Sequence, residues 1–431
     1  MIVLKNGLVV DPDSNYSDYA DVVIIGEKIA MIEKNIDIQK LEEETAEKAE
    51  ILDCNGCIIG PGLVDVHVHF RDPGFTYKED IYTGAKAAAR GGVTSVVLMA
   101  NTKPVVDNVE TLEYVLNKGK ETDIHIYSCA SITKGLKGEE IVDMQELLMK
   151  GAAGFTDDGI PILDEEMVRR VMHEAAKTSS VLSFHEENPA YITNNGINNG
   201  IGSGYFGVEG SDRLAEITMV ERDLKLALET GAVVNFQHIS TKEAVEAIRR
   251  AKSLPEGKNI HAEATPHHMS MTEEDLQSYV TLAKMNPPLR TAEDREAITQ
   301  GIVDGTMDII ATDHAPHSDE EKGKKITEAP SGIIGLETSM AVSYNTLVRT
   351  GKMDIVQLFC RMSKNPAEMY KINAGKLAID RTADIVIFDP NKDHLYDTTY
   401  SKSFNSPLKK SLITGDVVVT ISSGRIIYKN L

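Results

Sequence analysis

The sequence Gly60-Pro61-Gly62-Leu63-Val64-Asp65-Val66-His67-Val68-His69-Phe70-Arg71-Asp72 is an apolar run that two histidines interrupt at a spacing of two residues. Residues i and i+2 of a β-strand point to the same face, so His67 and His69 are expected to lie side by side near the end of a strand. Two neutral imidazoles at this spacing suit a divalent transition metal such as zinc. The simpler alternative is one core histidine beside one hydrogen-bonded histidine. Residues elsewhere in the chain are needed to distinguish this alternative from a metal site.

From Gly62 onward, short apolar stretches alternate with helical ones, a pattern typical of a parallel sheet with crossover helices. Eight strands are expected, at residues 64–70, 94–99, 124–129, 154–156, 181–184, 233–237, 260–264 and 308–311. Helices are expected between them at residues 78–90, 108–120, 139–150, 164–178, 212–230, 241–251 and 292–301. Eight such units over about 250 residues favour a closed (β/α)8 TIM barrel over an open sheet.

Both ends of the chain have a different character, with short strands expected around residues 2–32 and 50–59 and again at 383–388, 417–421 and 424–428. The acidic run at 40–50 is expected to be a solvated helix or loop, and helices are expected at 334–350 and 355–363. The sequence therefore predicts an α/β protein in which residues 59–370 form the barrel. Residues 1–58 and 371–431 are expected to form one small flanking β-sandwich domain.

Composition limits the possible partners. The 431-residue chain has a formal net charge of -21, which disfavours nucleic acid and anionic membranes. No apolar run is as long as a transmembrane helix, and the N-terminus does not resemble a signal peptide. Four cysteines favour a reducing, cytoplasmic location, and Cys54-Asn55-Gly56-Cys57 is interpreted as strand residues around a turn rather than a zinc or redox motif. An anionic substrate would need local positive charge in such an acidic protein.

Polar residues recur where the expected strands end, which is where TIM barrels hold their active sites. They are His67, His69 and Arg71, then Asn101, Asp157-Asp158, His185-Glu186-Glu187, His238 and Asp313-His314. Four imidazoles and two carboxylates are too many ligands for one catalytic zinc, but they suit two metals that share a carboxylate and a water. An aspartate beside that water can act as general base and then general acid, which is the chemistry of amide hydrolysis. Strand alternation lets only one of Asp157 and Asp158 point inward.

Several motifs carry a family resemblance. They are residues 61–74, Met99-Ala100-Asn101-Thr102, Phe155-Thr156-Asp157-Asp158-Gly159, Phe184-His185-Glu186-Glu187-Asn188, Lys284-Met285-Asn286-Pro287-Pro288-Leu289-Arg290, Thr312-Asp313-His314-Ala315-Pro316-His317 and Gly335-Leu336-Glu337-Thr338. Through these motifs the chain resembles the amidohydrolase superfamily and, within it, the dihydroorotases of the bacterial type I class. The resemblance implies reversible cyclisation of N-carbamoyl-L-aspartate to dihydroorotate in pyrimidine biosynthesis.

The resemblance also implies roles for single residues. Two zinc ions per subunit are expected, bridged by Asp158 and a water or hydroxide, with Asp313 as the catalytic base. The implied ligands are His67, His69, Asp158 and Asp313 for the first zinc, and His185 and His238 with the bridging Asp158 for the second. The implied substrate contacts are Arg71, Asn101 and His317 at the carboxylate, Asn286, Ser331 and Gly332 at the ring amides, and His69 beside them.

Two alternatives remain open at the level of sequence. One is another cyclic amidase, such as a dihydropyrimidinase, hydantoinase or allantoinase, but these typically bridge their metals with a lysine. The nearest lysine, Lys150, precedes the fourth strand. The other is a non-catalytic relative that only scaffolds aspartate transcarbamoylase, although such proteins have usually lost the metal histidines. A homodimer is expected, and association with aspartate transcarbamoylase is left open. His314 is expected to be a hydrogen-bonding neighbour, and His267 and His268 have no assigned role.

Overall fold

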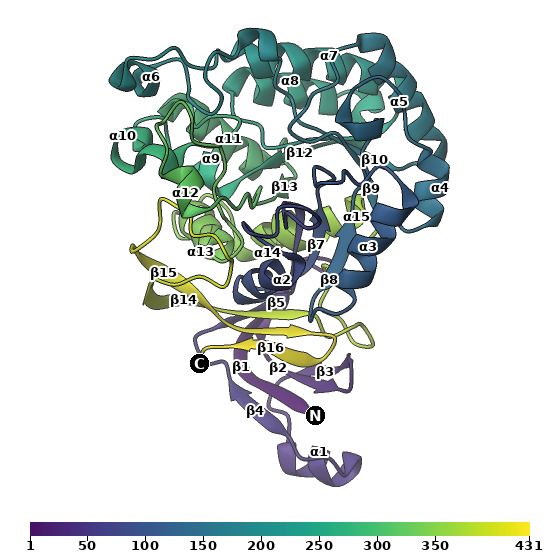
Figure 1. Cartoon of the computed structure of the whole chain (residues 1–431). Coiled ribbons are helices and arrows are strands. Elements are labelled where there is room, and N and C mark those ends of the chain that lie inside the picture. Colours follow the sequence, from purple (N-terminus) through teal and green to yellow (C-terminus); the bar gives the residue numbers. More distant parts are fainter.

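The computed structural model describes all 431 residues and has two parts (Figure 1). One part contains the strand–helix alternation, and the other is a β-sheet that holds both chain termini. None of the helices combines the length and the hydropathy needed to cross a membrane.

Eight parallel strands occur where the sequence predicts them. They are β6 (Leu63–Val68), β7 (Val93–Leu98), β8 (His125–Ser128), β9 (Gly154–Thr156), β10 (Val181–Phe184), β11 (Val233–Phe236), β12 (Ile260–Ala264) and β13 (Ile309–Ile310). They form one sheet in the order β13-β12-β11-β10-β9 and another in the order β6-β7-β8. Single bridges, Ala130 with Phe155 and Val68 with His314, link the two sheets at their edges. The predicted closed barrel is therefore not formed as one continuous ladder.

The ladder of parallel strands is interrupted beside β13 for a local reason. The backbone N–H of Thr312 donates to the Asp65 carboxylate at 3.2 Å instead of to a neighbouring strand. The next residue, Asp313, has a φ of 48°, a left-handed conformation that cannot continue a strand. As a result β13 has only two residues, although the sequence predicts four.

Helices cover the outer faces of the parallel strands. They are α2 (Ile81–Arg90), α3 (Val109–Gly119), α4 (Met144–Met149), α5 (Glu165–Thr178), α7 (Leu214–Thr230), α8 (Lys242–Lys252) and α11 (Ala292–Asp304). Two of them begin later than predicted because an aspartate caps them: Asp80 accepts a hydrogen bond from Thr83 N, and Asp143 from Glu146 N, each at 2.9 Å. Four short helices were not predicted: α6 (Ile201–Phe206), α9 (Pro266–Ser270), α10 (Asp275–Tyr279) and α12 (Asp319–Lys322).

Strands from both chain ends share one sheet, as the sequence predicts. They are β1 (Ile2–Asp11), β2 (Tyr16–Ile25), β3 (Lys28–Glu33), β4 (Glu50–Asp53), β5 (Ile58–Pro61), β14 (Ile385–Leu395), β15 (Leu412–Ser422) and β16 (Arg425–Lys429). The order is β16-β15-β14-β5-β1-β2-β3, with β4 also paired to β1. Side chains from β1, β2, β5, β14 and β15 share one apolar core, so the branched sheet folds over that core.

The remaining helices connect these parts. The acidic run forms α1 (Ile38–Thr45), and α13 (Ser339–Ser343), α14 (Ile355–Phe359) and α15 (Asn365–Met369) follow the last parallel strand. Met369 of α15 packs with Val64, Val66 and Val97 in an apolar cluster inside the parallel strands. This apolar cluster lies below the carboxyl ends of the same strands, which are followed by polar residues.

Candidate active site

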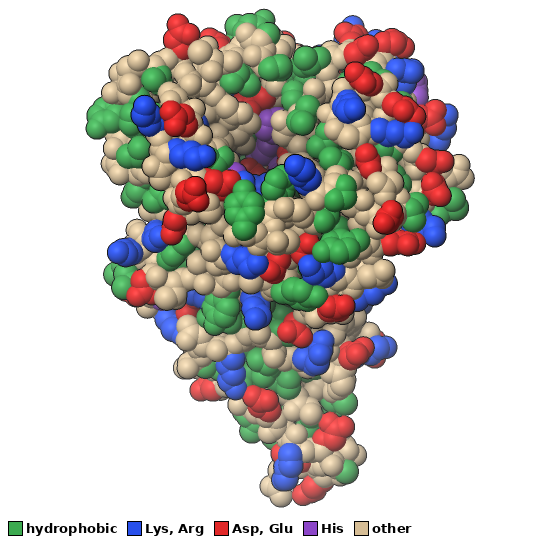
Figure 2. Space-filling view, viewed as in Figure 1, with side chains coloured by type: hydrophobic (Ala, Val, Ile, Leu, Met, Phe, Trp, Pro, Cys, Tyr) green, Lys and Arg blue, Asp and Glu red, His purple; other side chains and the backbone are tan.

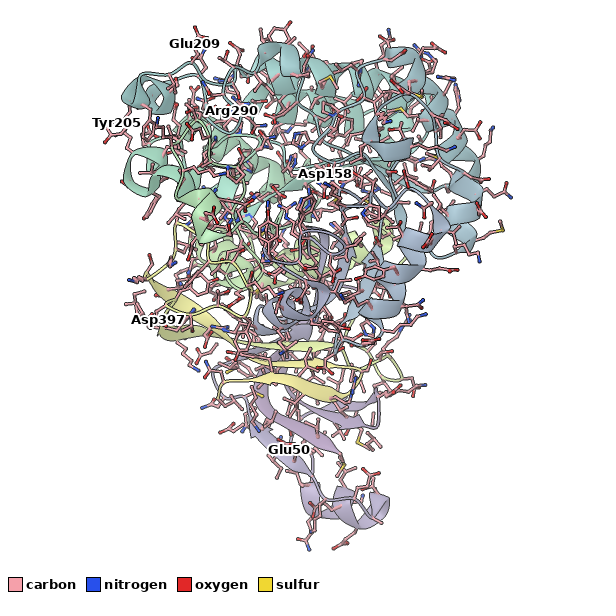
Figure 3. The ribbon with its side chains drawn as sticks, in the orientation of Figure 1. Glu50, Asp158, Tyr205, Glu209, Arg290 and Asp397 are labelled. Atoms are coloured by element: carbon pink, nitrogen blue, oxygen red, sulfur yellow. The ribbon has the colours of Figure 1, made fainter.

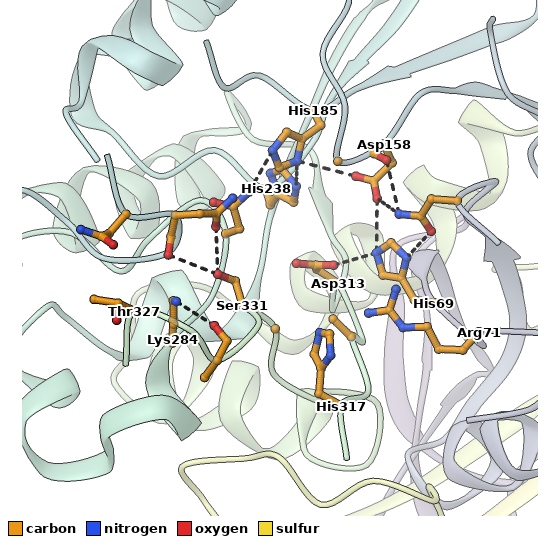
Figure 4. Close-up of a pocket in the computed structure, with 18 of the residues that line it drawn as sticks. His69, Arg71, Asp158, His185, His238, Lys284, Asp313, His317, Thr327 and Ser331 are labelled. Atoms are coloured by element: carbon orange, nitrogen blue, oxygen red, sulfur yellow. Dashed lines mark hydrogen bonds and ion pairs between the residues drawn. The ribbon is translucent and has the colours of Figure 1, made fainter. Parts of the chain in front are cut away.

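Six side chains converge at the carboxyl ends of the parallel strands, and Figure 4 labels five of them, all except His67. They come from the ends of β6, β9, β10, β11 and β13, and all are buried: His67, His69, Asp158, His185, His238 and Asp313. The ligand atoms of His67, His69 and Asp313 lie within 4.8 Å of one another, as do those of His67, Asp158 and His238. Figure 2 shows histidine side chains at the bottom of a depression in the upper part of the molecule.

Asp158 lies between two groups of imidazoles. Its carboxylate oxygens lie 3.5 Å from His67 Nε2, 3.4 Å from His69 Nε2 and 3.7 Å from His185 Nδ1. His185 Nδ1 is 3.0 Å from His238 Nε2, which places two ring nitrogens against each other. One carboxylate therefore faces both halves of the cluster, and Figure 3 shows it in the middle of the α/β part.

Asp313 lies beside His67 and His69, the two histidines at the end of β6. Its Oδ1 lies 3.1 Å from His69 Nε2 and 3.5 Å from His67 Nε2. Its second oxygen, Oδ2, makes no hydrogen bond within the chain and faces the cavity that Asp313 lines.

The outer ring nitrogens of the histidines are bonded to acceptors, which fixes how the rings turn. Glu263 Oε2 accepts from His67 Nδ1 at 3.0 Å, and Glu187 Oε2 accepts from His185 Nε2 at 3.1 Å. A ring that donates one N–H outward has its lone pair on the inner nitrogen, the arrangement found around bound metals. His67 Nε2 is buried and has no hydrogen-bond partner in the chain. Together with the donor set of imidazoles and carboxylates, this unpartnered nitrogen fits a divalent metal.

The two carboxylates of the cluster are held in the ionised form that a metal ligand requires. Burial raises the pKa of Asp313, but the nearby His67 and His69 outweigh burial and lower it to about 2. The pKa of Asp158 lies well below its usual value because the histidines likewise outweigh burial. Burial and the neighbouring His185 lower the pKa of His238, which keeps that ring neutral.

The two adjacent aspartates point in opposite directions, as strand alternation requires. Asp157 Oδ1 accepts hydrogen bonds from the backbone N–H groups of Ile132 at 2.7 Å and Thr133 at 3.1 Å. These bonds hold Asp157 away from the histidines. Asp158 is therefore the carboxylate that faces the cluster.

Three residues of the site have left-handed backbone conformations. The φ angles are 59° for Arg71, 31° for His238 and 48° for Asp313. Side chains with a Cβ adopt such angles at a cost, and strained residues of this kind concentrate at functional sites. Here the turn redirects each residue as its strand ends, so that its side chain faces the cavity.

A cavity of about 410 Å³ opens above the cluster. All six residues that the sequence predicts as further substrate contacts line it: Arg71, Asn101, Asn286, His317, Ser331 and Gly332. Asn101 Oδ1 accepts from His69 Nδ1 at 3.0 Å and its Nδ2 donates to Asp158 Oδ2 at 3.1 Å, so it also orients the cluster.

Arg71 and His317 both line the cavity, but only Arg71 is cationic. The Nε of Arg71 donates to the backbone carbonyl of Pro316 at 3.3 Å, and the guanidinium has no ion pair with any carboxylate of the chain. His317 Nδ1 lies 3.3 Å from Lys78 Nζ. Burial, Arg71 and Lys78 all lower the pKa of His317, which keeps its ring neutral.

Sequence reasoning assigned no role to several residues of the site, although it named Glu187 and Lys284 within its motifs. Lys284, Asn194, Asn195 and Thr327 also line the cavity, and Glu263 and Glu187 lie behind the histidines. Glu263 left a signal in the sequence, because it is a charged residue inside the apolar strand 260–264. Asn194 and Asn195 lie in an irregular loop, where no periodic pattern marks them.

The three histidines without assigned roles are neighbours of the site. His314 Nδ1 accepts from Gly335 N at 3.2 Å, so His314 is the hydrogen-bonding neighbour that the sequence predicts. His268 Nε2 contacts the carbonyl of Pro287 at 3.0 Å. Burial lowers the pKa of His268 to about 4 and that of His267 to about 3, so both rings are neutral.

Comparison with known proteins agrees with this geometry. Residues 58–427 match the model of the amidohydrolase family. The chain is 48% identical over 428 residues to a dihydroorotase of Clostridioides difficile, covering 99% of this chain and 100% of that protein. It is 44% identical to the dihydroorotase of Clostridium acetobutylicum, covering 100% of both. The structure of an L-hydantoinase from Arthrobacter aurescens superposes with a TM-score of 0.86 at 24% identity, over 99% of this chain and 96% of that one, which shows a shared fold. The resemblance seen in the sequence is confirmed, and the chain belongs to the amidohydrolase family and, within it, to the dihydroorotases.

Proposed function

We propose that the protein is a dihydroorotase, which catalyses the reversible cyclisation of N-carbamoyl-L-aspartate to (S)-dihydroorotate and water in pyrimidine biosynthesis. Proteins named dihydroorotase that are 43–48% identical over 99–100% of this chain support this function. The structural observation that carries it is the position of Arg71, a guanidinium without a carboxylate partner in the cavity above the histidine cluster.

Arg71 distinguishes this substrate from other cyclic amides. The chain carries 66 acidic residues, yet none pairs with this half-buried guanidinium. A partly desolvated charge without a partner is unfavourable, so the site favours a ligand that brings a carboxylate. Dihydroorotate and carbamoyl aspartate both carry one, whereas hydantoin and dihydrouracil do not. We infer that Arg71, Asn101 and His317 bind this carboxylate.

We further propose that the cluster binds two zinc ions. His67, His69, Asp158 and Asp313 would hold the first ion, and His185 and His238 the second, with Asp158 as the shared ligand. The position of Asp158 within 3.7 Å of ring nitrogens on both sides supports this sharing. The chemistry that such a pair supplies when bound is polarisation of the amide carbonyl and a lowered pKa for a water between the ions.

Asp313 moves the proton in this mechanism. Its ionised carboxylate accepts a proton at Oδ2 as a water adds to the carbonyl carbon of the ring amide. The C–N bond then breaks, and Asp313 returns the proton to the departing nitrogen. In the direction of cyclisation Asp313 takes a proton from the carbamoyl nitrogen as the ring closes. Asn286 and the backbone at Ser331 and Gly332 orient the ring amides, with His69 beside them.

The proposal extends to the architecture. We infer that the two parallel sheets make up one (β/α)8 barrel within residues 59–370, with residues 1–58 and 371–431 as the flanking β-sandwich domain. The single bridges at both seams and the core shared by both chain ends support this division. All four cysteines are free, which supports a reducing, cytoplasmic location. Homodimer formation and association with aspartate transcarbamoylase stay predictions.

The test is a substrate panel with metal analysis on the same purified sample. We expect turnover of dihydroorotate and carbamoyl aspartate, none of hydantoin, dihydrouracil or allantoin, and two zinc ions per chain. Asp158→Asn should lower the metal content, whereas the matched variant Asp157→Asn should leave it unchanged. Turnover of hydantoin without turnover of dihydroorotate would refute the proposed substrate.

A further inference from the structure

A segment of the C-terminal part of the chain reaches the cavity. Residues 399–405, here called the strap, lie between β14 and β15, and in Figure 1 this yellow segment leaves the sheet toward α12 and α13. The backbone N–H of Lys402 donates to Glu79 Oε1 at 3.2 Å, and Ser403 Oγ donates to the carbonyl of Lys78 at 2.7 Å. Lys402 Nζ also pairs with Asp80 at 2.5 Å. These contacts hold most of the strap on residues 78–80.

The last strap residue, Asn405, makes a different set of contacts. Its Oδ1 accepts from the backbone N–H of His317 at 3.0 Å. Its Nδ2 donates to the carbonyls of Ala315 at 2.9 Å and Gly332 at 3.0 Å. The side chain is 1% exposed, so these bonds form away from water. One carboxamide therefore joins the two loops that carry His317 and Gly332.

Those two residues also touch each other. Gly332 has a φ of 141°, and a Cβ at this position would lie 2.9 Å from His317 Cδ2. The imidazole of His317 therefore packs directly on the Gly332 backbone, where no larger residue fits. A shift of Gly332 would move the ring of His317 with it.

Neighbouring contacts fix Gly332, whereas the backbone N–H of His317 depends on Asn405. The backbone N–H of Gly332 donates to Lys284 O at 2.9 Å, and its carbonyl also accepts from Lys322 Nζ at 2.9 Å. The backbone N–H of His317 donates only to Asn405 Oδ1. Without it, a buried donor would lose its partner.

We propose that Asn405 is a positioning residue for substrate recognition, which sets the distance between His317 and Gly332 from the opposite end of the chain. The inference rests on the proposed function, because His317 and Gly332 are the groups that would contact dihydroorotate. Contacts with residues 78–80 hold the strap, so the side-chain amide of Asn405 is not needed for that purpose and bonds only to the loops of His317 and Gly332. The effect of its loss should therefore fall on substrate binding.

The experiment compares metal-loaded wild type with Asn405→Ala and Asn405→Asp. The aspartate keeps the size and the acceptor for His317 N but turns an oxygen toward two carbonyl oxygens, and it provides a second variant if the alanine does not fold. We expect KM for dihydroorotate to rise about tenfold in either variant, while kcat changes less than about threefold and the metal content is unchanged. Hydrogen exchange should accelerate in peptides covering residues 315–333 and stay unchanged in β1–β3.

Asn345→Ala is the control, because Asn345 Nδ2 also donates to a strand carbonyl, Thr414 O at 2.7 Å, in a part-buried hydrogen bond that lies outside the cavity. Its KM should equal that of wild type. Wild-type KM and exchange in folded Asn405 variants would overturn the positioning role. A wild-type enzyme that does not turn over dihydroorotate would instead overturn the proposed function, and hydrogen exchange would still report on the loops.

Discussion

Replacing Glu263 by glutamine should weaken metal binding without removing a ligand. Glu263 is fully buried and accepts two hydrogen bonds, from His67 Nδ1 at 3.0 Å and from Asn235 Nδ2 at 2.5 Å. Both partners are donors, but a glutamine has only one oxygen to offer them. Either Asn235 or His67 then loses its acceptor, or His67 shifts its proton to the nitrogen that faces the metal.

The expected drop in metal affinity follows from the loss of this hydrogen bond. Leaving one buried donor without a partner costs about 1–3 kcal/mol, which corresponds to about a fivefold to 150-fold change in affinity. Loss of an acceptor behind a metal histidine typically lowers metal affinity by about 10–100-fold, within the same range. We therefore expect Glu263→Gln to lose metal at roughly tenfold to 100-fold lower chelator concentration than wild type.

The assay is a chelator titration that follows bound metal by elemental analysis and turnover in parallel. Asp416→Asn is the matched control: Asp416 is 1% exposed and pairs with Arg90 at 2.7 Å, but it lies in β15, away from the cavity. Its loss should lower stability and leave the chelator midpoint unchanged. If Glu263→Gln releases metal at the wild-type chelator concentration, Glu263 does not orient His67.

Three further changes test the proton carrier, the anion contact and a distant ion pair. Asp313→Asn, compared with wild type in the metal-loaded form, should lower kcat by about 10³-fold, and substantial turnover in that form would show that another group moves the proton. Arg71→Met should raise KM for dihydroorotate by about 10–150-fold, as expected for a lost charged hydrogen bond, and an unchanged KM would remove Arg71 from the substrate site. The hydrogen bond to Asp384 at 3.1 Å raises the pKa of His125, so its stabilisation is complete below pH 6.5 and is lost as pH rises through the raised pKa. His125→Gln should therefore destabilise the protein more at pH 6 than at pH 9 in urea unfolding, and equal losses would contradict the ion pair.

The order of the parallel strands could be predicted because each is a short apolar run between turn signals. The predicted strands at 154–156, 181–184 and 260–264 match β9, β10 and β12 residue for residue. Helix starts were less predictable, since Asp80 and Asp143 cap α2 and α4 at their N-termini and so begin both helices inside a longer helical pattern. The short helices α9 and α12 contain five and four residues, too few for a 3.6-residue period to be visible.

The cluster of the site could be predicted because its residues lie at the ends of parallel strands. Residues that follow parallel strands in the sequence come together at one edge of the folded sheet. Asn405 and Glu263 lack that relation. Asn405 contacts His317 across 88 residues and Gly332 across 73, and nothing in the local sequence around it signals either loop. Such residues become visible only when the chain is folded, because their role depends on a buried hydrogen bond and not on a repeat or a motif.

The charge of the site explains how an acidic protein can bind an anion. The overall charge of -21 repels a carboxylate at long range, but salt screens charges beyond about 8–10 Å. Within that distance lie four imidazoles, at least one of them held neutral by burial, the carboxylates Asp158 and Asp313, and the carboxylates Glu263 and Glu187 behind the histidines. The two divalent cations that we propose would offset these four carboxylates, and Arg71 would then supply the positive charge that attracts the substrate. Because its ring is neutral, His317 would contribute hydrogen bonding to a substrate carboxylate without further positive charge.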